Sequence, residues 1–111
     1  MSVAGRAAVG GKDDPWLSIL VPAYNVEAYV RECLESAIRQ ATGDVEVIVV
    51  DDCSTDRTAD VIEEIQAANP GRLRVERLPE NGGVYKARIR LLELARGDYV
   101  WLVDADDRIK E

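Results

Sequence analysis

Short apolar runs alternate with longer segments of helical periodicity along most of this sequence, and this alternation constrains the possible folds more than any other feature. The runs at residues 17–21, 45–50, 73–78 and 99–103 have the length and composition of strands. Each of the first three is followed by a segment in which apolar residues recur every three or four positions, as on one face of a helix. Pro22 is expected to end the first strand, and Gly97 to cap the last helix. Strands that alternate with helices build parallel sheets, so we predict an α/β fold: a Rossmann-like, open and mostly parallel sheet with helices on both faces.

The ends of this pattern define the domain organisation that we predict. Residues 1–15 are rich in Gly and Ala, show no periodicity and lack the apolar core of a signal peptide. We therefore predict a flexible N-terminal tail over residues 1–15 and one folded domain over residues 16–111. Residues 99–103 are apolar on both faces, which suits a buried strand. With no neighbour on its outer side, this strand would form a sticky sheet edge through which the chain could self-associate.

Composition excludes several classes of function. The formal net charge of −7 argues against nucleic-acid binding, which needs a basic surface. The apolar runs of the sequence are too short to cross a bilayer. Cys33 and Cys53 have neither the spacing of metal ligands nor a disulfide-rich context, which favours a reducing cytoplasm.

Polar residues follow three of the predicted strands at the point where each strand ends. They are Pro22-Ala23-Tyr24-Asn25, Asp51-Asp52 and Asp104-Ala105-Asp106-Asp107. The carboxyl ends of parallel strands share one edge of the sheet, which is where open α/β proteins bind their ligands. We therefore expect the three segments to meet in a single crevice.

The last of these segments has the chemistry of a cation site. In an extended backbone Asp104 and Asp106 project to the same side, whereas Asp107 points elsewhere. Clustered carboxylates repel one another unless a cation lies between them, and ligand sets made only of oxygen select Mg²⁺ or Mn²⁺. Such ions complete their coordination with substrate phosphates and water, so a diphosphate ligand is expected. The alternative is that these acids only cap a helix or solvate a turn.

The other two segments suit a nucleoside. Tyr24 at a strand end can stack on a base, and Asp52 can accept a hydrogen bond from a base N–H or a ribose hydroxyl. Asp51 and Asp52 also precede a helix, where carboxylates interact favourably with the helix dipole. Asn25 is equally suited to cap a helix, and the Asn81-Gly82-Gly83 segment to form a tight turn.

Four segments, LSILVPAYN, VIVVDDCSTDRT, NGGVYKAR and ARGDYVWLVDADD, resemble in order and spacing the opening half of family 2 glycosyltransferases. The resemblance implies a GT-A fold that binds a nucleoside-diphosphate sugar, with a UDP-sugar as the expected donor. It implies that Asp104 approaches the ribose or a metal-bound water, that Asp106 ligates Mn²⁺ or Mg²⁺, and that Arg88 matches a helix arginine of the family. Ile89 and Leu91 depart from the family, because many members have Asn and Gly there. The positions assigned to donor binding are Pro22, Ala23, Tyr24, Asn25, Asp51, Asp52, Arg88, Asp104 and Ala105, and those assigned to the metal are Asp104 and Asp106.

The same resemblance implies inverting chemistry. A carboxylate base deprotonates an acceptor hydroxyl while the metal stabilises the departing nucleoside diphosphate. The family's base follows the Asp-x-Asp motif, so we expect it beyond Glu111 and expect this chain to bind the donor without a complete catalytic site. Family members often use lipid or cell-envelope glycan acceptors, which would place the protein in the cytoplasm or at the membrane periphery.

Two other classes of protein share parts of this pattern. A non-catalytic module for nucleotide or protein binding could keep the same fold without sugar transfer. A receiver-type signalling domain also combines α/β topology with clustered aspartates around Mg²⁺. Its acidic pair is expected after the first strand, however, where this sequence has Pro22-Ala23-Tyr24.

Overall fold

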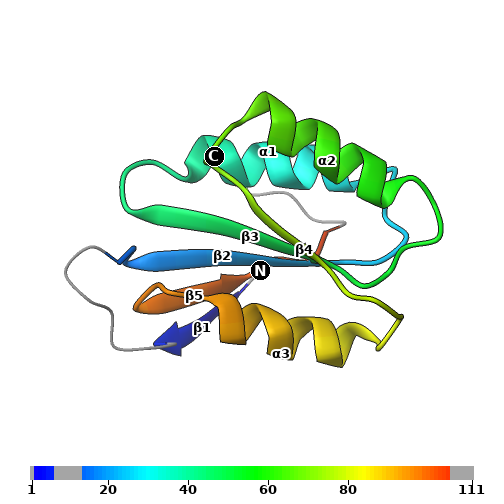
Figure 1. The fold of residues 1–111 in the computed structure, drawn as a ribbon. Coiled ribbons are helices and arrows are strands. Elements are labelled where there is room, and N and C mark those ends of the chain that lie inside the picture. Colours follow the sequence, from blue (N-terminus) through cyan, green and yellow to red (C-terminus); the bar gives the residue numbers. More distant parts are fainter. Residues whose placement is uncertain (1, 7–13, 106–111) are drawn as a thin grey trace.

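The computed structural model describes residues 2–6 and 14–105. Five strands and three helices follow one another along this part of the chain (Figure 1). In order they are β1 (Ser2–Arg6), β2 (Leu17–Ala23), α1 (Val30–Gln40), β3 (Val45–Asp51), α2 (Thr58–Ala68), β4 (Arg74–Arg77), α3 (Val84–Leu94) and β5 (Tyr99–Leu102). Each helix has 11 residues, and within the described ranges no helix is long and apolar enough to cross a membrane.

The strands form a single sheet in the order β1-β5-β2-β3-β4. The central strand β2 pairs in parallel with β3 on one side and with β5 on the other, and β4 extends the sheet in parallel beyond β3. The chain passes through α1 between β2 and β3, and through α3 between β4 and β5, so the order of strands reverses at β2. The predicted α/β class, with an open and mostly parallel sheet, is confirmed.

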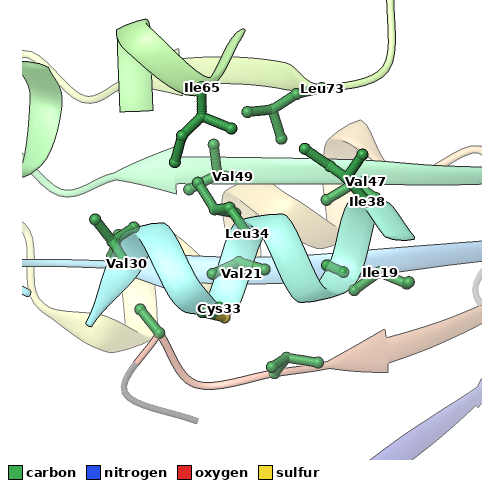
Figure 2. Close-up of a cluster of buried hydrophobic side chains, with 14 of the residues drawn as sticks. Ile19, Val21, Val30, Cys33, Leu34, Ile38, Val47, Val49, Ile65 and Leu73 are labelled. Carbon is green, nitrogen blue, oxygen red and sulfur yellow. The ribbon is translucent and has the colours of Figure 1, made fainter. Parts of the chain in front are cut away.

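Helices cover both faces of the sheet: α1 and α2 lie on one face and α3 on the other (Figure 1). Alternate residues of β2 point to opposite faces, so Ile19 belongs to the core under α1 whereas Leu20 belongs to the core under α3. Figure 2 shows the first core, in which Cys33, Leu34 and Ile38 of α1 pack over the valines of β2 and β3. Counted from Val30 of the same helix, Cys33 lies three positions on and Leu34 four, and Ile38 lies four beyond Leu34, which is the helical period that the sequence displays.

β2 runs beyond Pro22, where the strand was expected to end. The carbonyl of Leu20 accepts from Val103 N on the β5 side, and the carbonyl of Ala23 accepts from Asp52 N on the β3 side. Backbone groups of successive residues point to opposite sides, so Pro22 directs its missing N–H toward the β5 side. Pairing with β5 has already ended at Leu20. Proline therefore removes no bond from the ladder at this position, and the predicted stop is wrong.

β1 lies antiparallel beside β5, with Val3 opposite Trp101 and Arg6 opposite Tyr99. Residues 2–6 therefore form a strand, contrary to the tail that we predicted for them. β5 is consequently not the open edge on which the predicted self-association depended. This strand could not be predicted from the sequence, because residues 2–6 lack an alternating pattern and pair with an edge that β5 provides.

Gly97 does not cap α3, because the helix ends at Leu94 and Ala95 occupies the capping position. Gly97 instead packs against the start of β2. A Cβ atom on Gly97 would lie 2.7 Å from both the backbone nitrogen and Oγ of Ser18. The Gly97 N–H donates to Ser18 Oγ over 2.8 Å. Glycine is required here by the close approach of two chain segments.

Glu46 joins four segments near this contact. Its side chain, which is 9% exposed, accepts from Ser18 Oγ, from Arg96 N over 2.7 Å and from Arg74 Nη1 over 3.1 Å. Burial raises the pKa of Glu46, but these hydrogen bonds and the positive charge of Arg74 outweigh burial and hold the pKa below its ordinary value of 4.5. The network ties β2, β3 and β4 to the connection between α3 and β5.

Candidate functional site

A cleft of about 270 Å³ opens at the carboxyl ends of β2 and β5, where the strand order reverses. Open α/β sheets bind ligands at such a reversal. The ends of three parallel strands and the start of α3 line the cleft with Pro22, Ala23, Tyr24, Val26, Asp52, Val84, Ala87, Asp104 and Ala105. The three polar segments that the sequence singled out thus meet in one crevice, as far as their residues are described.

A larger hollow of about 600 Å³ lies at the opposite edge, around the amino ends of β3 and β4. Its arginines have structural partners. Arg72 Nη2 donates to two carbonyls at the end of α1, each over 2.8 Å. Arg74 and Arg96 both pair with Glu46. The hollow therefore brings together residues that hold the fold, and the smaller cleft is the candidate site.

Asp52 anchors the loop that precedes α3. The residue is 2% exposed, and Oδ1 accepts from Gly82 N and Oδ2 from Gly83 N, each over 2.9 Å. Gly83 has a φ of 87°, a conformation that favours glycine and fits the turn predicted for this segment. A carboxylate has about four acceptor positions, so about two remain for a ligand in the cleft. Asp52 thus holds one wall of the cleft and also faces its interior.

Asp104 follows β5 at the rim of the cleft, and its side chain is 57% exposed. Arg88 of α3 pairs with it, with 3.4 Å between Arg88 Nη2 and Asp104 Oδ1. Arg88 does not line the cleft and, among the residues described, reaches it through Asp104 alone. The second predicted metal ligand, Asp106, and its neighbour Asp107 lie outside the described residues. The pairing of Asp104 with Asp106 around a metal therefore stays a prediction.

Asn25 joins two loops and does not line the cleft. Its Oδ1 accepts from Thr55 N over 2.8 Å, and its own N–H donates to Ser54 Oγ over 3.0 Å. The φ angles of Asn25 and Cys53 are 50° and 58°, values that residues other than glycine rarely adopt. Such strain persists where the surrounding contacts hold the backbone in place. Asn25 therefore fixes the loops that carry the cleft residues, and this position does not support the direct donor contact that we predicted for it.

Asp51 points away from the cleft, although it precedes Asp52 directly. Its side chain is 2% exposed, its Oδ1 accepts from Ser54 N over 3.2 Å, and Arg77 Nε lies 3.4 Å from Oδ2. Successive residues at a strand end project to opposite faces, so the two aspartates cannot both enter the cleft. The structure thus separates two residues that were predicted together to bind the donor.

Three residues of the cleft, Val26, Val84 and Ala87, were not predicted from the sequence. Val84 and Ala87 are three positions apart and so lie on one side of α3. Their apolar spacing indicated a core-facing surface, and only their closeness to Asn81-Gly82-Gly83 hinted at a ligand. Tyr24 was predicted correctly to lie at the cleft, where it is 43% exposed.

Comparison with known proteins gives this arrangement a family. The model described as Glycosyl transferase family 2 matches residues 18–111. The uncharacterized glycosyltransferase EpsJ of Bacillus subtilis (strain 168) is 41% identical over 95 residues, which are 86% of this chain and 27% of EpsJ. The crystal structure of S. aureus TarS 1-349 in complex with UDP-GlcNAc is similar with a TM-score of 0.75 and 42% identity, covering 85% of this chain and 27% of that one.

A third similarity is found at lower sequence identity. The mannosyltransferase PcManGT from Pyrobaculum calidifontis, in complex with GDP-Man and Mn²⁺, has a TM-score of 0.81 at 28% identity and covers 98% of this chain. The present chain spans less than a third of the length of EpsJ, of the TarS structure and of PcManGT. These structural similarities confirm the GT-A type of fold. Because the family model matches residues 18–111, which are most of the sequence, the chain belongs to glycosyl transferase family 2.

Proposed function

We propose that this chain binds a nucleoside-diphosphate sugar, with a UDP-sugar as the preferred donor, for transfer of the sugar to an acceptor hydroxyl. The observation that carries the proposal is the cleft at the reversal of strand order, where Tyr24, Asp52 and Asp104 come together from three strand ends. The nucleotide sugars present in the TarS and PcManGT structures support the proposal, because both proteins are structurally similar to this chain.

The nucleobase would lie against Tyr24 and Asp52. The exposed ring of Tyr24 offers a face for stacking. The carboxylate of Asp52 offers only acceptors, so it suits a base that presents a ring N–H, as uracil and guanine do. Cytosine and adenine present an unprotonated ring nitrogen at that edge, which would face the carboxylate unfavourably. This chemistry favours UDP and GDP over CDP and ADP.

The oxygen chemistry of Asp104 fits a divalent ion such as Mn²⁺ or Mg²⁺. The described residues contain no ready-made group of three or more metal-ligating side chains. Mg²⁺-like ions need only one or two carboxylates, because the diphosphate and water complete their coordination. Asp104, together with Asp106, would hold such an ion, which when bound would stabilise the charge of the departing nucleoside diphosphate.

Sugar transfer also requires a base for the acceptor hydroxyl. Among the described residues that line the cleft, only Asp52 and Asp104 are acidic. In the proposed complex Asp52 contacts the nucleobase, and Asp104 lies at the diphosphate end of the donor. We therefore assign donor binding to this cleft and place the catalytic base elsewhere, as the family resemblance led us to expect.

Isothermal titration calorimetry tests the proposal. UDP, GDP, CDP and inorganic pyrophosphate are titrated into the chain with Mn²⁺ and, separately, with EDTA. We expect UDP and GDP to bind more tightly than CDP, and Mn²⁺ to strengthen the binding of UDP. The proposal is wrong if UDP binds no better than pyrophosphate when Mn²⁺ is present.

A further inference from the structure

Within the part of the chain that the structure describes, Arg88 contacts the cleft only through Asp104, and this indirect position suggests a role other than direct contact with the donor. We propose that Arg88 is the resident countercharge of the donor cleft: it weakens the binding of a free metal ion and favours the binding of a diphosphate. The inference rests on the proposed function. It makes Arg88 a positioning residue that acts through the field it imposes on Asp104.

The charge distribution around the cleft supports this role. The chain has a net charge of −7, and the acidic side chains among the described cleft residues are Asp52 and Asp104. A diphosphate that approaches these carboxylates is repelled unless a positive charge is close. The Arg88 guanidinium, 3.4 Å from Asp104, is such a charge and belongs to the protein itself.

A second observation concerns the other end of the same guanidinium. Arg88 Nε is buried and has no hydrogen-bond partner among the described residues. Among the described residues the Arg88 side chain therefore pairs with Asp104 alone and retains donor capacity beside that pair. A buried donor without a partner is unusual in folded proteins, and a catalytic role, a bound water or a bound ion is among its explanations.

The proposal has a distinctive thermodynamic consequence. A cation at Asp104 stands next to Arg88 and is repelled by it, so removing the charge of Arg88 strengthens the binding of Mn²⁺ alone. The same change removes attraction for UDP when no metal is present, so the binding of UDP weakens. If Arg88 had a purely structural role, its replacement would instead weaken the binding of both Mn²⁺ and UDP, because the cleft would lose its shape.

Arg88→Gln in the full chain tests these opposite signs, and Arg90→Gln provides the matched control. Arg90 lies on the same helix and pairs with Glu76, but it does not line the cleft. The binding of Mn²⁺ alone is followed by the loss of the aqueous Mn²⁺ signal in electron paramagnetic resonance. Calorimetry in EDTA at low salt measures the binding of UDP.

We expect Arg88→Gln to bind Mn²⁺ about two- to fivefold more tightly and metal-free UDP about two- to fivefold more weakly, which is the range that an exposed ion pair contributes. Arg90→Gln should match the unmodified chain for both ligands. Arg88→Lys, which keeps the charge, should also resemble the unmodified chain, and it tests the proposal if Arg88→Gln does not fold.

The countercharge proposal is wrong if both affinities of Arg88→Gln move in the same direction or stay unchanged. It is also wrong if Arg88→Lys, which keeps the charge, binds metal-free UDP more weakly than the unmodified chain by about twofold or more. Failure of the proposed function gives a different result. In that case the unmodified chain binds UDP no better than pyrophosphate even with Mn²⁺. If the unmodified chain binds UDP but Arg88→Gln does not show the two opposite shifts, the countercharge proposal is refuted and the proposed function is not.

Discussion

Asp51 and Asp52 are adjacent, chemically identical and directed to opposite sides of the sheet edge, so their amide variants form a direct test of the site. Asp52→Asn replaces one carboxylate oxygen by an NH₂ group of nearly the same size. In the native structure the two oxygens accept from Gly82 N and Gly83 N at 2.9 Å each. The amide oxygen can satisfy only one of these glycines, and the NH₂ group confronts the N–H of the other.

The magnitude follows from the bond that is lost. A hydrogen bond to a charged group contributes about 1.5–3 kcal/mol, and the loop before α3 forms one side of the cleft. Losing one such bond, together with the negative charge that faces the base N–H, should weaken UDP binding by about 2 kcal/mol, or about thirtyfold in Kd. Asp51→Asn should lower thermal stability, because it weakens the pairing with Arg77, but leave the Kd for UDP within about twofold.

Calorimetric titration of UDP in the presence of Mn²⁺ gives both Kd values, and circular dichroism confirms that each variant is folded at the temperature of the titration. The reasoning is refuted if Asp52→Asn retains the native Kd. It is also refuted if Asp51→Asn weakens UDP binding as much as Asp52→Asn does. The second result would mean that the whole strand end matters and that the orientation of the two carboxylates does not.

Three further predictions concern other parts of the molecule. Tyr24→Ala should raise the Kd for UDP at least about fivefold, because a stacked base contributes about 1–3 kcal/mol, while Tyr29→Ala, a second exposed tyrosine outside the cleft, should leave it unchanged in the same titration. Gly97→Ala should lower the free energy of unfolding in urea by about 3 kcal/mol, because its Cβ meets backbone atoms of β2, whereas Gly71→Ala, with a φ of 77° and no atom within 4 Å, should cost about 1 kcal/mol. The contribution of Glu46 to stability should be complete above pH 4.5 and should disappear as the pH falls through its lower folded pKa, because protonation then favours the unfolded chain. In Glu46→Gln the melting temperature should therefore vary less with pH over that acidic range.

Much of the fold could be predicted from residue patterns because burial leaves a periodic trace in the sequence. Ile19 and Leu20 alternate between two cores, as a strand covered on both faces requires. Leu34 and Ile38 repeat at the helical period that places them over the sheet. The meeting of Tyr24, Asp52 and Asp104 followed from the same pattern, since parallel strands bring their carboxyl ends to one edge.

The predictions that failed depend on contacts between segments far apart in the chain. Residues 2–6 form a strand because β5 offers an edge, and no local pattern announces this. Gly97 follows a helix, as a capping glycine does, but it is required by the approach of Ser18 from β2. Pro22 remains inside β2 because the pairing with β5, on the side to which its missing N–H points, has already ended at Leu20.

The candidate site divides in the same way. The sequence by itself determined which chemical groups reach the crevice region, because the ends of apolar strands can be located from periodicity alone. Only the tertiary structure decided that Asp52 enters the cleft while Asp51 turns to Arg77, that Asn25 joins two loops, and that Arg88 pairs with Asp104. The physical reason is that periodicity records whether a residue is buried, whereas the partner of a polar side chain depends on which distant segments the fold brings within hydrogen-bonding distance.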